Sequence, residues 1–197
     1  DFEGQKGTMA ELKILHFIMM AYTAKQALHE VYPGERPYII NRAGYAGIQR
    51  YAQVWGGDNL TDWRTLKFNI ATILGMGISG CANMGCDIGF AGPAPEEELL
   101  LRWIQNGVLQ PRFCLNSANN DNTVTQPWMY EKMLPHIRAA YRLRYRMLPY
   151  LYSLFYESSQ DGMPIWRPLF LEFPQDPQCY GDQSLTFMLG SSILVAS

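Results

Sequence analysis

Residues 62–90 have the sequence DWRTLKFNIATILGMGISGCANMGCDIGF, in which a helical pattern is followed by an apolar run and then by a polar loop. Apolar side chains recur at spacings of three and four residues in the first part, which predicts an amphipathic helix over residues 62–74. Residues 78–84 predict a buried strand, and residues 85–90 form a loop that contains two glycines and one acid. The apolar side chains of the helical pattern are Trp63, Leu66, Ile70 and Leu74.

The same alternation of helix and strand continues on both sides of this stretch. Helical patterns cover residues 9–31, a segment beginning at 95, and residues 130–158. Short apolar runs that predict strands cover residues 36–41, 109–115, 165–170, 185–189 and 192–196. Strands separated by helices of this length are typical of parallel β/α units. The predicted fold class is therefore α/β, as part of a (β/α)8 barrel, because the chain has too few units to close a barrel alone.

The composition is that of an ordinary folded domain. Of 197 residues, 48% are hydrophobic and 17% are charged, so disorder is excluded. The net charge of −2 gives no general attraction for nucleic acid, and no apolar run is long enough to span a membrane. The chain starts at Asp1 without a methionine and stops directly after an apolar run, so we expect a segment of a larger protein whose N-terminal part is missing.

Three motifs favour structural interpretations over functional ones. The sequence GMGISG at residues 75–80 matches the glycine pattern of a dinucleotide loop, but it follows a helix instead of preceding one, so we interpret it as a helix stop. Arginines and aromatics alternate over residues 137–146, which we interpret as an amphipathic helix whose arginine stems cover apolar surface. The sequon at Asn59 adjoins a candidate catalytic acid, so we discount it as a glycosylation site.

Polar side chains gather on the loops that follow the predicted strands. An acid at Asp58 follows Trp55 and two glycines, which suits a sugar pocket, because an indole offers an apolar face while a carboxyl donates or accepts a proton. The alternative interpretation is a loop acid that caps the next helix. The residues of this set are Arg42, Arg50, Trp55, Asp58, Asp87 and Asn116.

Several ordered blocks of the chain resemble glycoside hydrolase family 31, the retaining α-glycosidases. The blocks are RPYIINRAG (36–44), QRYAQVWGGDN (49–59), GCDIGF (85–90), ELLLRW (98–103), RYRMLPYLY (144–152), PIWRPLFLEFP (164–174) and FMLG (187–190). The resemblance implies that residues 1–174 form the second half of the catalytic barrel and that residues 175–197 begin a C-terminal β-sandwich. It also implies two catalytic carboxylates, an oligosaccharide or glycoconjugate substrate, and no metal or organic cofactor.

The resemblance assigns roles to individual side chains. Asp58 falls in the sequence block that carries the family's acid/base residue. Asp1 is the candidate nucleophile, and the alternative is that the nucleophile lies in the missing N-terminal part. Carboxyl groups about 5–5.5 Å apart would fit a retaining mechanism. The positions expected to line the sugar pocket are Arg42, Trp55, Asp87, Phe90 and Asn116, with Arg50 close behind. Asp87 is expected either to touch sugar or to hold Arg42.

Two positions depart from the family pattern. Asn116 stands where the family usually has a histidine, and Ala118 stands where related sequences often have a bulky aromatic. Both changes open space near C2 and C3 of a bound sugar, which motivates the hypothesis of an α-N-acetylgalactosaminide substrate. The alternatives are an α-glucosidase or α-galactosidase, a transglycosylase of the same family, and a non-catalytic carbohydrate-binding or structural homologue.

Overall fold

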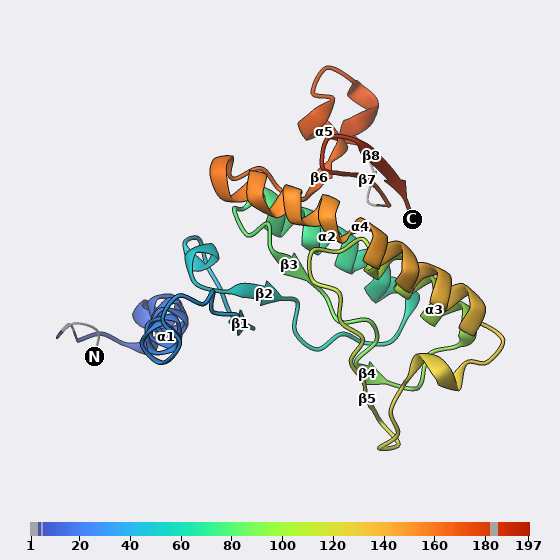
Figure 1. Ribbon diagram of the computed structural model, residues 1–197, viewed down its shortest axis with the longest axis horizontal. Helices are drawn as coiled ribbons and strands as arrows, with labels where there is room; N and C mark the ends of the chain where they lie inside the picture. The colour runs from blue at the N-terminus through green and yellow to red at the C-terminus, as the bar shows by residue number, and fades with distance from the viewer. Residues whose placement is uncertain (1–3, 5, 182–184) are drawn as a thin grey trace.

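The computed structural model describes residue 4, residues 6–181 and residues 185–197 (Figure 1). Its α-helices are α1 (Met9–Val31), α2 (Trp63–Ile78), α3 (Glu97–Gly107), α4 (Leu134–Asp161) and α5 (Leu169–Glu172). Its strands are β1 (Ile40–Asn41), β2 (Gln53–Trp55), β3 (Met84–Gly85), β4 (Ala91–Gly92), β5 (Ala118–Asn119), β6 (Trp166–Pro168), β7 (Thr186–Leu189) and β8 (Ile193–Ala196). Short 3-10 turns lie at Ile48–Arg50, Pro127–Met129 and Pro177–Tyr180.

The first three strands form a parallel sheet in the order β1-β2-β3. Ile40 pairs with Gln53, and Trp55 pairs with Gly85. A further parallel bridge joins Ile88 to Leu115, so a fourth chain segment continues the series. Because parallel strands in sequence order bring their carboxyl ends to one edge, the loops after each strand gather there, as the predicted β/α barrel requires.

Local sequence features set where helix α2 begins and ends. The side chain of Asp62 caps the helix by accepting a hydrogen bond from the backbone N–H of Thr65 at 2.6 Å. The helix then runs to Ile78, so the strand predicted from residue 78 was wrong, and β3 begins only at Met84. The helix stop predicted over residues 75–80 is confirmed, because α2 ends at Ile78 and Gly80 has a φ of +88°. Gly77 itself lies inside α2, where a Cβ would come within 3.0 Å of Pro164.

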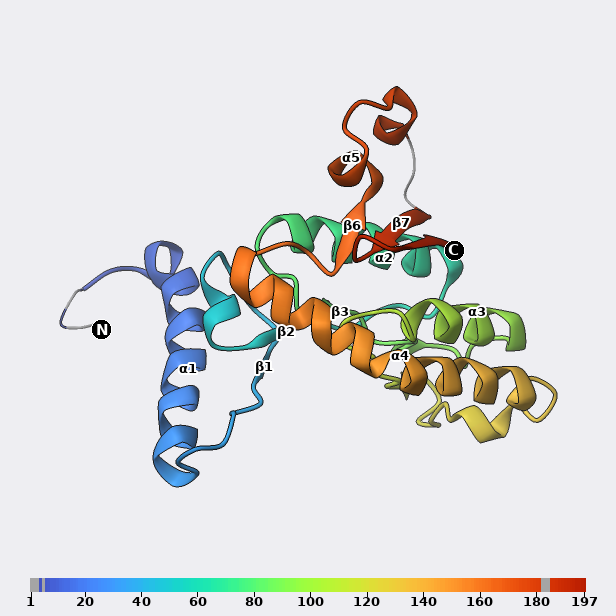
Figure 2. The ribbon, with the colours of Figure 1, turned by 45° about the horizontal axis from the view of Figure 1, so that its top comes forward.

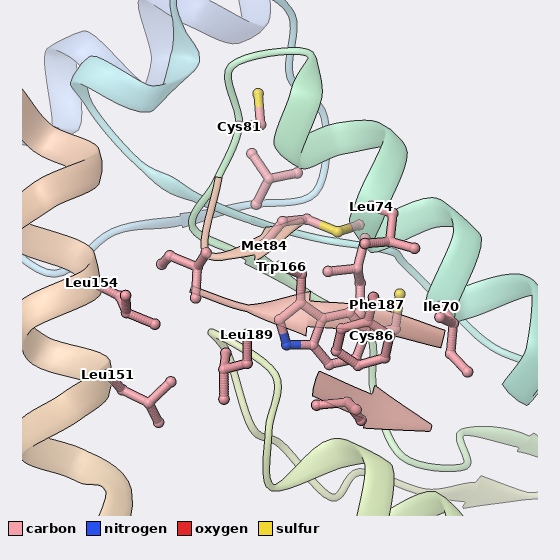
Figure 3. Close-up of a cluster of buried hydrophobic side chains, with 14 of the residues drawn as sticks. Ile70, Leu74, Cys81, Met84, Cys86, Leu151, Leu154, Trp166, Phe187 and Leu189 are labelled. Atoms are coloured by element: carbon pink, nitrogen blue, oxygen red, sulfur yellow. The ribbon is translucent and has the colours of Figure 1, made fainter. Parts of the chain in front are cut away.

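The main core lies between α2, α4 and the C-terminal sheet (Figure 3). Trp166 and Phe187 stack with ring centroids 3.9 Å apart at an interplanar angle of 26°. The indole N–H of Trp166 donates to the carbonyl of Leu109 at 2.8 Å, so this large ring is buried with its polar atom satisfied. Helix α2 adds the side chains of Ile70 and Leu74 to this core, and helix α4 adds those of Leu151 and Leu154 (Figure 3).

The last strands form an antiparallel sheet in the order β6-β7-β8. The sheet draws residues from both sides of the boundary predicted at residue 174, because Trp166 pairs with Leu189. The strand predicted over residues 165–170 is shorter than expected, since the chain turns into α5 directly after Pro168. The Tyr150 hydroxyl of α4 donates to the Leu189 carbonyl at 2.8 Å and ties this sheet to the barrel helices.

The two ends of the helical series differ in how they pack. Helix α1 has a capping box between Thr8 and Glu11, yet Ala21 is its only buried residue, and Figures 1 and 2 show it at one side of the molecule. Helix α4 begins at Leu134 instead of the predicted residue 130, and it passes in front of α2 in Figure 1 and lies beside α3 in Figure 2. Among the described residues, no helix combines the length and apolar character needed to cross a bilayer.

Candidate active site

Most of the predicted site residues follow neighbouring parallel strands, at the point where each strand ends. Arg42 follows β1, Trp55 is the last residue of β2 with Asp58 three positions later, and Asp87 follows β3. Asn116 comes directly after Leu115, which bridges to the segment after β3. The parallel register therefore brings these side chains to one edge of the sheet, as the sequence predicted.

The first cluster at this edge is an ion pair between Arg42 and Asp58. A guanidinium nitrogen of Arg42 lies 3.1 Å from Asp58 Oδ2, and the two side chains are 58% and 46% exposed. Gly57 makes the approach of the two loops possible, because it has a φ of +79° and a Cβ there would lie 3.2 Å from Arg42 Nε. Asp58 is thus a solvent-accessible carboxylate that a cation holds in place.

The second cluster is a buried pair between Asp87 and Arg112. Arg112 Nη1 lies 2.6 Å from Asp87 Oδ1, and their side chains are 11% and 2% exposed. Asn116 Nδ2 donates to the other carboxylate oxygen at 3.1 Å. The guanidinium also lies over the Trp55 ring, 6.0 Å from its centroid, so this pair connects three consecutive strand ends.

This pairing corrects one expectation and adds a residue that the sequence analysis missed. Of the two roles expected for Asp87, that of holding Arg42 was wrong, since Asp87 pairs with Arg112 while Arg42 pairs with Asp58. Arg112 went unnoticed because it lies within an apolar run. No local signal marks Arg112 as the partner of Asp87, because the two segments become neighbours only in the fold, where Ile88 bridges to Leu115.

Asn59 fixes the loop that carries Asp58. Its side-chain amide donates to the backbone carbonyl of Asp87 at 3.0 Å, and the residue is 7% exposed. The hydrogen bond ties the loop after β2 to the loop after β3. Because this amide nitrogen is buried and engaged, the sequon has a structural role, which agrees with discounting it as a glycosylation site.

Of the remaining two predicted residues, Phe90 lies near the site and Arg50 does not. Phe90 is half-buried on the loop after β3, and its carbonyl accepts from the Ala118 N–H at 2.6 Å, which ties it to the segment that carries Asn116. Arg50 is not brought to the same edge. It is exposed in the turn before β2, at the opposite end of that strand from Asp58, where its carbonyl accepts from Lys25 at 2.7 Å.

Two thiols lie beside the buried pair. Burial, and secondarily the Asp87 carboxylate, raises the pKa of Cys86 to about 12. Burial also raises the pKa of Cys114, with Arg112 acting in the opposite direction. Both thiols are therefore protonated near neutral pH and poorly nucleophilic. Within the described part of the chain, no group of three His, Cys, Asp or Glu side chains is placed to hold a metal ion.

The fold and the site together define part of a β/α barrel with an exposed carboxylate, an indole and a buried acid at the strand ends. The family described as Glycosyl hydrolases family 31 TIM-barrel domain matches residues 3–154, and the family 31 C-terminal domain matches residues 162–197. The chain belongs to glycoside hydrolase family 31.

Three glycosidases show 37–42% sequence identity to this chain. A probable glucan 1,3-alpha-glucosidase of Oryza sativa subsp. japonica is 42% identical over 161 residues, which cover 81% of this chain and 17% of the relative. Alpha-glucosidase 2 of Bacillus thermoamyloliquefaciens is 37% identical over the whole chain, which covers 25% of that relative. Alpha-xylosidase 1 of Arabidopsis thaliana is 40% identical over 163 residues, covering 83% of this chain and 18% of the relative.

Solved structures of the family share the fold. A dextranase of family 31 from Flavobacterium johnsoniae, complexed with glucose, superposes with a TM-score of 0.88 at 30% identity, covering 96% of this chain and 24% of that one. A glucosidase II alpha subunit superposes with a TM-score of 0.85 at 34% identity, covering 92% and 20%. The chain thus spans a quarter or less of the length of these proteins.

Proposed function

We propose that the full-length protein is a retaining, exo-acting α-glycoside hydrolase that cleaves a terminal α-linked sugar by double displacement, with Asp58 as its acid/base. The observation that carries this proposal is the position of Asp58, exposed beside Arg42 at the strand edge that also presents Trp55. A carboxyl that exchanges protons with substrate must reach the glycosidic oxygen, and an exposed side chain steadied by a cation satisfies that need.

In this mechanism the Asp58 carboxyl first gives its proton to the leaving oxygen as the bond to the anomeric carbon breaks. A second carboxylate attacks the same carbon from the opposite side and forms a glycosyl-enzyme. Asp58 then takes a proton from water, whose oxygen displaces the nucleophile and restores the starting enzyme. Asp1 remains our candidate nucleophile, and it lies outside the described residues.

The buried pair at the base of the site supplies fixed charge instead of proton transfer. Asp87 is engaged by Arg112 and Asn116, so its carboxylate is held in one orientation, and the Arg112 guanidinium lies over the Trp55 ring. Because this carboxylate is 2% exposed and both of its oxygens are engaged, it orients Arg112 and the exposed Asn116 instead of reaching solvent itself. We therefore propose that Asp87 contributes to sugar binding by holding Arg112 and Asn116 in place at the base of the site.

For the sugar we propose an α-glucoside. The relatives at 37–42% identity are named glucosidases and a xylosidase, and none of the named relatives above supports an N-acetylgalactosaminide. The hypothesis of a widened pocket relied on the small size of Asn116 and Ala118. Asn116 instead directs its amide to Asp87, so this side chain takes part in the polar base of the site.

The test is turnover by the full-length protein of nitrophenyl α-glycosides of glucose, galactose, xylose and N-acetylgalactosamine, with Asp58→Asn as the control. We expect turnover of the α-glucoside, and a loss of at least about 100-fold in kcat in the control. Nitrophenol leaves without help from an acid, but hydrolysis of the glycosyl-enzyme still needs Asp58 as general base. Preference for the acetamido sugar would overturn the choice of sugar. Turnover unaffected by Asp58→Asn would overturn the mechanism.

The alternatives separate in the same experiment. A transglycosylase uses both carboxylates and differs in transferring the sugar to an acceptor, so excess acceptor would yield transfer products in place of free sugar. A non-catalytic homologue would show binding of oligosaccharide without turnover of any glycoside in the panel.

A further inference from the structure

Arg144 lies on α4, on the face turned toward the chain segment that leads into Arg112. Its guanidinium is half-buried, and its Nη1 donates to the carbonyl of Val108 at 3.0 Å and to that of Gln110. Its Nη2 donates to the carbonyl of Pro111 at 3.0 Å. The side chain also lies over the ring of Phe113, 5.9 Å from the centroid. One guanidinium therefore fixes the backbone over residues 108–111.

The clamped segment is joined directly to both members of the buried pair. Pro111 is covalently followed by Arg112, so the position of its carbonyl sets where the Arg112 side chain starts. The side chain of Gln110, which is fully buried, accepts a hydrogen bond from the backbone N–H of Cys86 at 3.0 Å. Cys86 immediately precedes Asp87, so the same segment also holds the start of the acid's loop.

We propose that Arg144 is a positioning residue of the site: by holding residues 108–111, it sets the geometry of the Asp87–Arg112 pair. The kinetic part of this proposal rests on the function proposed above, because it needs a reaction to observe. The planar guanidinium is essential, since it presents several N–H groups in a fixed fork, whereas a lysine ammonium is a compact charge on a flexible stem. Three carbonyls at fixed positions therefore match arginine and not lysine.

A purely structural role is the competing explanation. On that explanation Arg144 only satisfies the carbonyls of Val108, Gln110 and Pro111, which follow the end of α3. In that case a replacement would lower the melting temperature and leave the reaction unchanged. A positioning role has a further consequence, because small displacements of groups around a reacting sugar reduce the rate itself.

The test compares Arg144→Lys with Arg146→Lys in the full-length protein. Arg146 is an exposed arginine two residues further along α4, so it controls for the loss of a guanidinium from this helix. For R144K we expect kcat on the α-glucoside to fall about tenfold or more, with KM changed less than about threefold. For R146K both constants should stay within about twofold of the wild type.

A crystal structure of R144K gives a readout that does not depend on turnover. We expect residues 108–111 to shift and the Arg112–Asp87 contact to lengthen from 2.6 Å. An unshifted segment with an intact pair, or a lower melting temperature with unchanged kcat, would overturn the proposal. Should the wild type turn over no glycoside, the proposed function fails, and the crystal structure still decides the role of Arg144.

Gln110→Met provides a second variant if R144K does not fold. It removes the acceptor for the Cys86 N–H with a side chain of similar length and leaves Arg144 in place. The proposal predicts the same selective loss of kcat, because the link from the clamped segment to the Asp87 loop is broken. Wild-type kcat in folded Q110M, together with an unchanged Asp87–Arg112 contact in its crystal structure, would overturn it.

Discussion

Replacing Arg112 by methionine is expected to leave the Asp87 carboxylate buried without its cation. The acid side chain is 2% exposed and that of Arg112 is 11% exposed, so water does not replace the lost partner. Methionine fills most of the space of the arginine stem, which keeps the cavity term small. The effect of the substitution should therefore report the electrostatics of the pair.

The magnitude follows from the contacts that remain. Removing one partner of a buried ion pair costs about 3–5 kcal/mol of unfolding free energy. Asp87 keeps the hydrogen bond from Asn116 at 3.1 Å, so we expect a cost at the lower end, about 3 kcal/mol. Adding Asp87→Asn to R112M removes the charge that needs a partner and should recover part of this loss.

The assay is urea unfolding of the full-length protein, followed through the transition that contains the barrel. Arg102→Met is the matched control, because Arg102 pairs with Glu98 at 3.6 Å with both side chains more than half exposed. Pairs of that kind contribute about 0–1 kcal/mol. If R112M and R102M unfolded within about 0.5 kcal/mol of each other, the account of a buried charged pair would be refuted.

Three further predictions concern the surrounding structure. Gly57→Ala should lower kcat/KM at least about tenfold in the glycosidase assay, because a Cβ at φ +79° is strained and displaces Arg42 from Asp58. In native protein at pH 8, Cys86 should resist iodoacetamide, as judged by peptide mass spectrometry, because burial raises its pKa to about 12; unfolded protein should react. Asp62→Ala should cost about 1 kcal/mol in thermal melts, and Asp62→Asn less. The Thr65 N–H lowers the pKa of Asp62, so this stabilisation is present above pH ~4 and lost as pH falls further.

The order of helices and parallel strands was predictable because apolar periodicity and glycine-bearing loops mark it directly. The same reasoning placed Arg42, Asp58 and Asp87 at one edge, since parallel strands align their carboxyl ends. Strand lengths were not predictable. Apolar residues next to a helix, such as Ile78, continue the helix when its backbone hydrogen bonds are already formed, and β3 keeps only two residues.

Which acid pairs with which base depends on contacts between distant segments. Asp87 and Arg112 are 25 positions apart, and nothing in the local sequence distinguishes Arg112 from Arg42 as the partner of that acid. Arg50 was predicted to lie close to the sugar pocket, and the structure places it elsewhere. It follows Arg42 closely in sequence, but the chain crosses back to the start of β2 between them, so the two arginines lie at different ends of the strands.

The role of Asp58 is the central claim, and azide rescue tests it most directly. Asp58→Ala in the full-length protein should lose activity on α-glucosides with poor leaving groups and retain more on those with good leaving groups, which need no general acid. Added azide should restore turnover and give the α-glucosyl azide, since it attacks the glycosyl-enzyme without needing a base. Equal loss on all leaving groups with no effect of azide, or a β-glucosyl azide product, would contradict the assignment of Asp58 as acid/base.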